Sequence, residues 1–171
     1  MFGKARFDDA ATFAAIPDGA DAVLPIDGRY EVDPAAAKRL GRVRWYTIGA
    51  DYARAGAIDW ELGNPCFTAH GLQRFVRGRE AMRARARVYL DRADAAAAVD
   101  ALSVAGLLRY PGLLWWVATL DGRPWTPEEL AADLRDRWHA DIHPGQIWAN
   151  QNRTVIERAG PVDVSDLFLP W

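Results

Sequence analysis

The chain has 171 residues, half of them hydrophobic and eight of them Trp, which excludes a disordered protein and predicts one packed domain over residues 1–171. Its formal net charge is only −2 with no dominant basic block, which excludes a nucleic-acid footprint. No apolar run approaches the roughly 20 residues of a membrane span. Cys66 is the only cysteine, so no internal disulfide is expected, and the first residues, MFGKARFDDA, lack the apolar core of a secretory signal.

Eight short runs rich in β-forming residues recur along the chain and predict eight strands. They occupy residues 5–7, 21–26, 42–49, 57–62, 85–90, 113–120, 145–151 and 161–168. The adjacent Trp115 and Trp116 in the sixth run must point to opposite faces of a strand, because side chains alternate there. We therefore expect the two rings to pack in different places, one of them in the core.

Helical patterns separate several of these strands. Three of them are predicted at residues 34–40, 68–83 and 94–105. The first has Asp33 as its N-cap, the second has Thr68 as its N-cap, and the third ends at Gly106.

The clearest helical pattern begins with the capping box TPEE at 126–129, which has proline at the first helical position. It leads into Leu130, Leu134 and Trp138, which share one stripe of the helix. We expect the charged residues of this helix to face water, namely Asp133, Arg135, Asp136 and Arg137.

Eight strands with helices between several of them predict an α/β fold, a compact (β/α)8 TIM-like barrel. Such barrels usually need about 200 or more residues. The chain is shorter than that, so we expect several helices to be shortened or missing, particularly after the first, third and seventh strands.

In such a barrel the chemistry lies at the carboxyl ends of the strands. Asp27, Asp91 and Asp121 sit beside glycines or helix starts there, so we expect them to form turns and caps. Asp59 and Glu61 differ, because they lie two residues apart in AIDWELGNP (57–65) and should share one face of a strand. Two close carboxylates push each other's pKa values apart, and glycoside hydrolysis needs one protonated acid beside an ionised one.

Six motifs occur in order over nearly the whole chain: RFDD (6–9), AIDWELGNP (57–65), ARVYLDR (86–92), LLWWVATLDG (113–122), IWANQN (147–152) and VDVSDLF (162–168). This order resembles the lysozyme-type glycoside hydrolases of family 25 and the shorter related barrels of actinobacteria and their phages. The resemblance implies a muramidase-type enzyme that cleaves peptidoglycan, as a phage lysin does, without a cofactor. Its bound partner would be the bacterial cell-wall glycan.

The resemblance also implies the residues of the site. Glu61 matches the proton donor, while Asp59, Asp163 and Asp8 match the acids that position or stabilise the reacting sugar. Asp9 is the alternative to Asp8 as the acid that faces the interior.

Four further residues are predicted to bind the substrate. Tyr89 matches the aromatic of the fifth strand, and Trp148 and Gln151 match a Trp–Gln pair in the seventh, although IWANQN spaces that pair one residue wider. Trp116 is a further candidate for stacking on a sugar ring.

A second function remains open, in which the same barrel is a non-catalytic module. It would bind the cell wall or serve as a structural part of a phage tail, with virion proteins as partners. In either role the chain is made in the cytoplasm, and incorporation into a virion or release by lysis would replace the missing signal.

Other chemistries have less support. The two serines lie outside any G-x-S-x-G motif, and no phosphate-binding glycine motif is present. Cys66 and His70 could form a cysteine nucleophile at a helix start, and His139 and His143 could hold a metal. No further orienting group can be named for the first pair, and the H-E-x-x-H motif is absent from the second, so we expect neither site.

Overall fold

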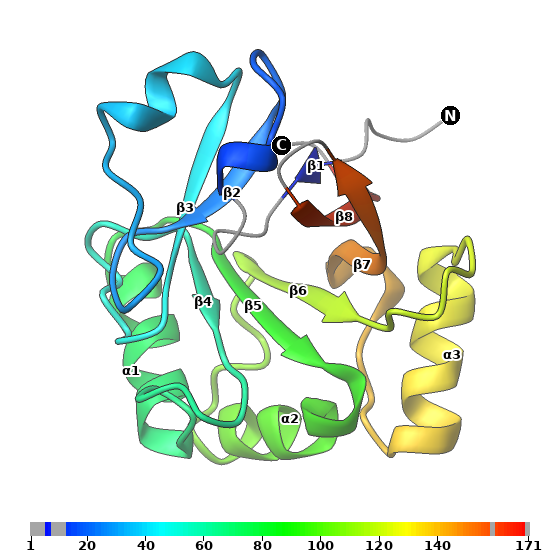
Figure 1. Cartoon of the computed structure of the whole chain (residues 1–171). Coiled ribbons are helices and arrows are strands. Elements are labelled where there is room, and N and C mark those ends of the chain that lie inside the picture. Colours follow the sequence, from blue (N-terminus) through cyan, green and yellow to red (C-terminus); the bar gives the residue numbers. More distant parts are fainter. Residues whose placement is uncertain (1–5, 8–12, 158–159, 170–171) are drawn as a thin grey trace.

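The computed structural model of the chain describes residues 6–7, 13–157 and 160–169. It is an α/β structure built on a curled, mostly parallel sheet of barrel-like form (Figure 1). Hydrogen bonds join the strands in chain order and also join β1 to β8, so the pairings form a ring. The strands are β1 (Arg6–Phe7), β2 (Ala22–Pro25), β3 (Val43–Thr47), β4 (Ala57–Asp59), β5 (Ala86–Asp91), β6 (Leu113–Ala118), β7 (Ile147–Glu157) and β8 (Gly160–Leu167). Each lies within or overlaps a predicted run.

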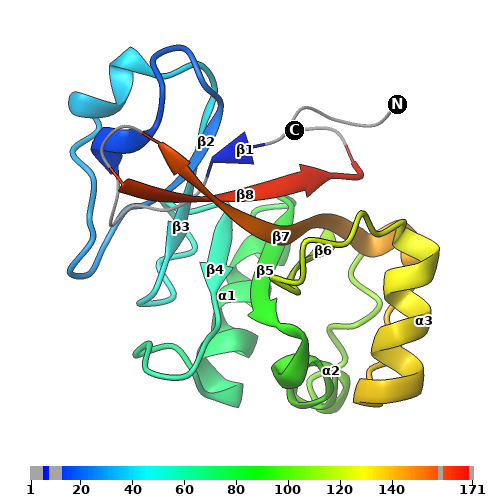
Figure 2. The same ribbon diagram turned by 45° about the vertical axis from the view of Figure 1, so that its right-hand side comes forward.

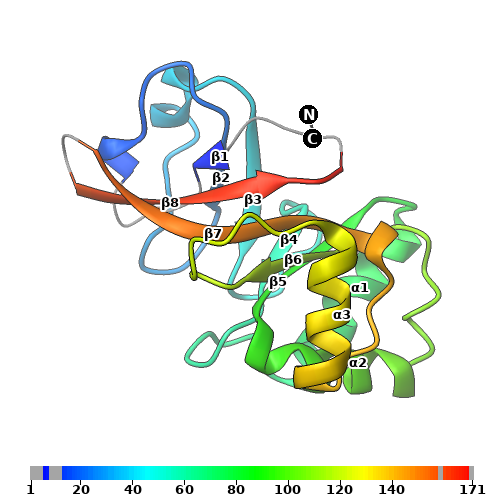
Figure 3. The same cartoon turned by 90° about the vertical axis from the view of Figure 1, so that its right-hand side faces the viewer.

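Strand β8 runs antiparallel to both of its neighbours, which departs from the parallel order of a (β/α)8 barrel. β7 leads directly into β8 as a long hairpin, in which Thr154 pairs with Asp163 and Glu157 with Gly160. This hairpin crosses one side of the sheet (Figures 2 and 3). An antiparallel neighbour needs no crossover helix, which is one reason why a short chain suffices for this many strands.

Three α-helices cover the outer side of the sheet around β4, β5 and β6 (Figure 1). They are α1 (Ala69–Ala81), α2 (Ala95–Val104) and α3 (Pro127–Trp138), and all three were predicted. The Thr68 hydroxyl accepts a hydrogen bond from Gly71 N, and both halves of the Thr126–Glu129 capping box form. Among the described residues, no helix has the length and apolar character that crossing a membrane requires.

Among the described residues, the β2–β3 side of the sheet carries short 3-10 turns, η1 (Phe13–Ala15) and η2 (Ala36–Arg39), and no α-helix. The short helix predicted at residues 34–40 is therefore present as a 3-10 turn, with Ala35 rather than Asp33 at its N-cap position. Asp33 does accept a hydrogen bond from Ala35 N at 2.8 Å, but so short a segment cannot offset the cost of nucleating an α-helix. No helix separates β3 from β4, and the expectation of reduced crossovers after the third and seventh strands is confirmed.

The core is divided by the sheet into an outer and an inner part, and β6 shows the division. Trp115 is 1% exposed and packs outward among the residues of the helices. Trp116 is 3% exposed and points inward, where it packs with Trp148. The prediction that the two rings pack in different places is confirmed.

Asp133 of α3 is buried, although the sequence predicted that it would face water. It lies three residues after Leu130 and therefore at the edge of the apolar stripe of the helix. Its Oδ1 accepts an ion-pair contact from Arg137 Nε at 3.2 Å, one helical turn later. Arg135, Asp136 and Arg137 are exposed as predicted.

Candidate active site

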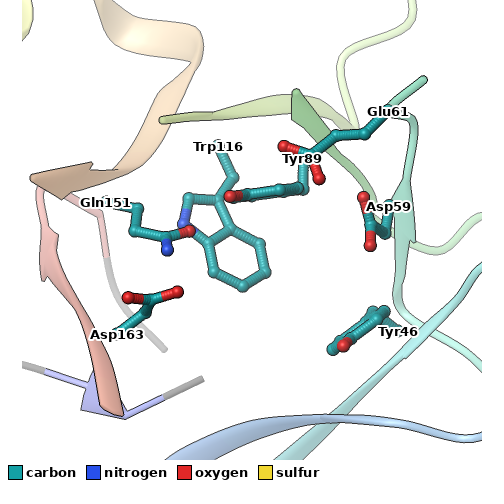
Figure 4. Close-up of a pocket in the computed structure, with 7 residues that line it drawn as sticks. All are labelled: Tyr46, Asp59, Glu61, Tyr89, Trp116, Gln151 and Asp163. Carbon is teal, nitrogen blue, oxygen red and sulfur yellow. The ribbon is translucent and has the colours of Figure 1, made fainter. Parts of the chain in front are cut away.

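A pocket of about 140 Å³ lies at the carboxyl ends of the parallel strands (Figure 4). We call it the central pocket. It is lined by Tyr46, Asp59, Glu61, Tyr89, Trp116, Gln151 and Asp163. All of these except Tyr46 were predicted as site residues, and the fold therefore brings together motifs that lie far apart in the sequence.

Strand register explains why one wall of the pocket is acidic and aromatic. Asp59 at the end of β4 is the pairing partner of Tyr89 on β5, and Tyr89 is in turn the partner of Trp116 on β6. Residues that pair across parallel strands present their side chains on the same face of the sheet. The rings of Tyr89 and Trp116 meet edge to face, with centroids 4.6 Å apart.

Glu61 lies just past the end of β4, so the prediction that it shares a strand with Asp59 is wrong. The turn after the strand nevertheless holds it at the pocket. Trp60 N donates to Tyr89 O at 2.9 Å, which extends the β4–β5 pairing by one residue. Asn64 then closes the turn, because its backbone N donates to Glu61 O at 3.1 Å and its side chain donates to Asp59 O at 3.1 Å.

Burial controls the ionisation of the two acids on this wall. It raises the pKa of Glu61 to about 7, with the negative charges of Asp59, Asp91 and Asp94 acting in the same direction and a hydrogen bond with Tyr89 opposing them. It also raises the pKa of Asp59 to about 6, against a side-chain hydrogen bond with Asn64. A buried carboxyl prefers its neutral form because charge is poorly solvated there. Near neutral pH, a substantial fraction of the Glu61 carboxyl therefore keeps its proton, while Asp59 beside it is more acidic.

Asp163 and Gln151 face these acids from the other side of the pocket (Figure 4). β8 is antiparallel, so Asp163 near its amino end reaches the edge at which the parallel strands finish. The Thr154 hydroxyl donates to Asp163 Oδ1 and fixes that carboxylate. Carboxyl groups thus approach the same hollow from two walls.

Trp148 does not line the pocket, although it was predicted to bind the substrate. Trp115 pairs with Ile147 and Trp116 with Ala149, so Trp148 is the extra residue of a β-bulge. The side chain is fully buried against Trp116, with ring centroids 5.6 Å apart, and therefore supports the pocket from within.

Sequence reasoning missed Tyr46 and the buried Arg87. Tyr46 on β3 pairs with Ala57, two residues before Asp59, so the alternation of β3 could have placed it at the pocket. Arg87 lies two residues before Tyr89 on β5, is 4% exposed, and stacks on Trp148 with 4.7 Å from Cζ to the ring centroid. Its burial lowers the pKa of the guanidinium to about 10. No sequence signal distinguishes it from the many exposed arginines.

The remaining predicted acids divide into two groups. Asp8 and its alternative Asp9 lie outside the described residues. Asp27, Asp91 and Asp121 have the predicted structural roles: Asp27 accepts from Ile48 N at 2.8 Å, Asp91 from Ala93 N at 2.7 Å, and Asp121 from Arg123 N at 3.1 Å.

The structure places the residues of the alternative nucleophile and metal sites in other surroundings. Cys66 is buried, its thiol donates to Asp59 O at 3.1 Å, and burial raises the pKa of the thiol to about 12, so a thiolate is disfavoured. His143 Nδ1 accepts from Gly145 N, while His139 ends α3 in a left-handed conformation. Within the part of the chain that the structure describes, no group of three His, Cys, Asp or Glu is placed to hold a metal ion.

No protein-family model, curated protein or solved structure matches this chain. The candidate site is therefore defined by its own geometry, as an acidic pocket with an aromatic wall in a barrel-like α/β sheet.

Proposed function

We propose that the chain is a lysozyme-like glycoside hydrolase that acts on peptidoglycan, on a reduced form of the (β/α)8 barrel. One observation carries the proposal: a single pocket combines Glu61, whose pKa is raised to about 7, with Asp59 beside it and Asp163 across from it. Glycoside hydrolysis needs such a protonated acid together with ionised carboxylates around the reacting sugar.

In the proposed reaction, Glu61 donates its proton to the glycosidic oxygen as the bond from that oxygen to the sugar carbon breaks. Asp59 and Asp163, when ionised, stabilise the positive charge that develops on the sugar ring. Tyr89 and Trp116 offer aromatic surface for the ring, and Gln151 offers an amide to its hydroxyl groups. Water then adds to the sugar carbon, and the proton that the water loses returns to the Glu61 carboxylate.

The choice of substrate rests on the order of the six motifs, which resembles that of the family 25 lysozymes. The same resemblance favours a phage lysin that is released by lysis or carried in a virion. Among neutral and acidic glycans, peptidoglycan is therefore the first substrate to examine.

The test uses purified bacterial peptidoglycan that is incubated with the protein and then sedimented. The proposal predicts soluble fragments with new reducing ends, identified by mass spectrometry. A protein that sediments with intact cell walls and releases no fragments would instead be the non-catalytic wall-binding module. Absence of both cleavage and binding would contradict both roles.

A further inference from the structure

A second, larger hollow opens beside the central pocket, between the turn after β2 and the turn after β4. We call it the Arg29 groove, formed by residues 27–30 and 61–65. Its volume is about 750 Å³, and it shares Tyr46, Asp59 and Glu61 with the central pocket, so the two hollows adjoin each other at these side chains. Ligand sites usually enclose about 300–1,000 Å³. The central pocket is smaller than this, so a polymer that reacts there must extend beyond it, and the groove is the adjoining space.

Arg29 is placed in this groove with its hydrogen-bond donors available. Asp27, which lines the same groove two residues before Arg29, is already engaged, because its two oxygens accept from the Thr47 hydroxyl and from Ile48 N. The Arg29 guanidinium lies over the ring of Tyr30, with Cζ 4.4 Å from the centroid. Among the described residues, this stacking is the only contact that engages the Arg29 guanidinium.

The charge of Arg29 is opposite to that of its surroundings. The other charged residues at the two hollows are acids, namely Asp27, Asp59, Glu61 and Asp163, and Arg29 is the only basic residue among the described residues that line them. A neutral glycan has no negatively charged group that could form an ion pair with this guanidinium. A carboxylate would do so, because the planar fork of an arginine binds both oxygens of a carboxylate.

We propose that the Arg29 groove binds a carboxylate-bearing part of the glycan strand that extends from the central pocket, with Arg29 recognising the carboxylate. This inference rests on the proposed function, since it assumes that a glycan occupies the pocket. Tyr30, which is 42% exposed, adds an aromatic face to the same surface. The groove thereby selects strands whose substituents end in free carboxylates, such as the peptide stems of peptidoglycan.

The experiment measures binding without cleavage, with Glu61→Gln as the parent protein. The probes are soluble peptidoglycan fragments with free stem carboxylates, and the same fragments after those carboxylates have been converted to amides. Adding Arg29→Gln should weaken binding of the carboxylate form about 5- to 10-fold at low salt, and the difference should shrink as salt screens the charge. Binding of the amide form should not change.

Arg109→Gln is the matched control, because Arg109 is also exposed but lies between α2 and β6, outside both hollows. It should leave binding of both probes unchanged. Equal binding with and without Arg29→Gln, equal weakening for both probes, or no binding of either probe to the parent overturns the inference.

The two proposals fail separately. If the wild-type protein releases no reducing ends while binding still depends on Arg29, the hydrolase proposal fails and the inference that the groove binds a carboxylate stands. If cleavage occurs and binding is independent of Arg29, the groove inference fails and the hydrolase remains.

Discussion

Tyr89 stands directly opposite Asp59 across the β4–β5 pair and also hydrogen bonds with Glu61 just past the end of β4. This single tyrosine therefore joins the two acids of the proposed reaction. Its hydrogen bond stabilises the ionised form of Glu61 and so opposes the effect of burial on the pKa of that acid.

Tyr89→Phe should consequently raise the pKa of Glu61 further. The ring that packs on Trp116 is kept, and the lost hydrogen bond should cost about 1 kcal/mol of folding stability. The measurement is the carboxyl chemical shift of Glu61 in an NMR titration, with the wild-type protein as reference. A pKa that falls in the variant would show that Tyr89 does not stabilise the Glu61 carboxylate.

The activity should depend on pH in a bell-shaped manner. The rate should fall as pH rises through about 7, where Glu61 loses the proton that it must donate. It should also fall as pH drops below about 6, where Asp59 becomes protonated and no longer stabilises positive charge. Because Glu61 and Asp59 interact, the two apparent pKa values of this pH profile belong to the pair of acids together. Initial rates on peptidoglycan between pH 4 and 9 test this, and a rate that keeps rising above pH 8 would contradict it.

The same ionisation predicts a gain in stability on removing Glu61. The folded state holds this proton more tightly than the unfolded state does, because the pKa rises from 4.5 to about 7 on folding. The stability of the wild-type protein should therefore fall as pH rises through this interval. Glu61→Gln should add up to about 3 kcal/mol at pH 8 and almost nothing at pH 4. Urea unfolding at both pH values measures this, and a variant that is less stable than wild type at pH 8 would contradict it.

Trp148 should matter for folding more than for binding. Trp148→Ala removes a fully buried ring and should cost about 3–5 kcal/mol. It also removes the ring on which the buried Arg87 stacks. Trp148→Phe keeps part of this packing and should cost less. Urea unfolding measures both variants, and an alanine variant as stable as wild type would show that the ring is not part of the core.

The sequence predicted the elements well where a local rule applies. The capping box at Thr126 and the cap at Thr68 both form, and the β runs are where alternating patterns put them. The reversed direction of β8 could not be predicted in this way, because strand direction depends on pairing partners and on the connection between strands. The bulge that buries Trp148 is likewise set by the β6–β7 register.

At the site, the order of the motifs was sufficient to predict most of the residues that line the central pocket, since strand ends from distant segments meet at one edge of the sheet. Tyr46 and Arg29 were missed for different reasons. Tyr46 required the register of β3 against β4, and Arg29 required the shape of two turns that are distant in the sequence. Turn shape depends on long-range packing, and local composition carries little information about it.

The most direct test of the central claim, that Glu61 is the proton donor of a glycoside hydrolase, is the rate of reducing-end release from peptidoglycan near pH 6.5. The wild-type protein and Glu61→Gln are compared, with circular dichroism to show that both are folded. A general acid contributes about 100- to 10,000-fold, so the variant should lose activity by that factor. Equal rates for the two folded proteins would contradict the account.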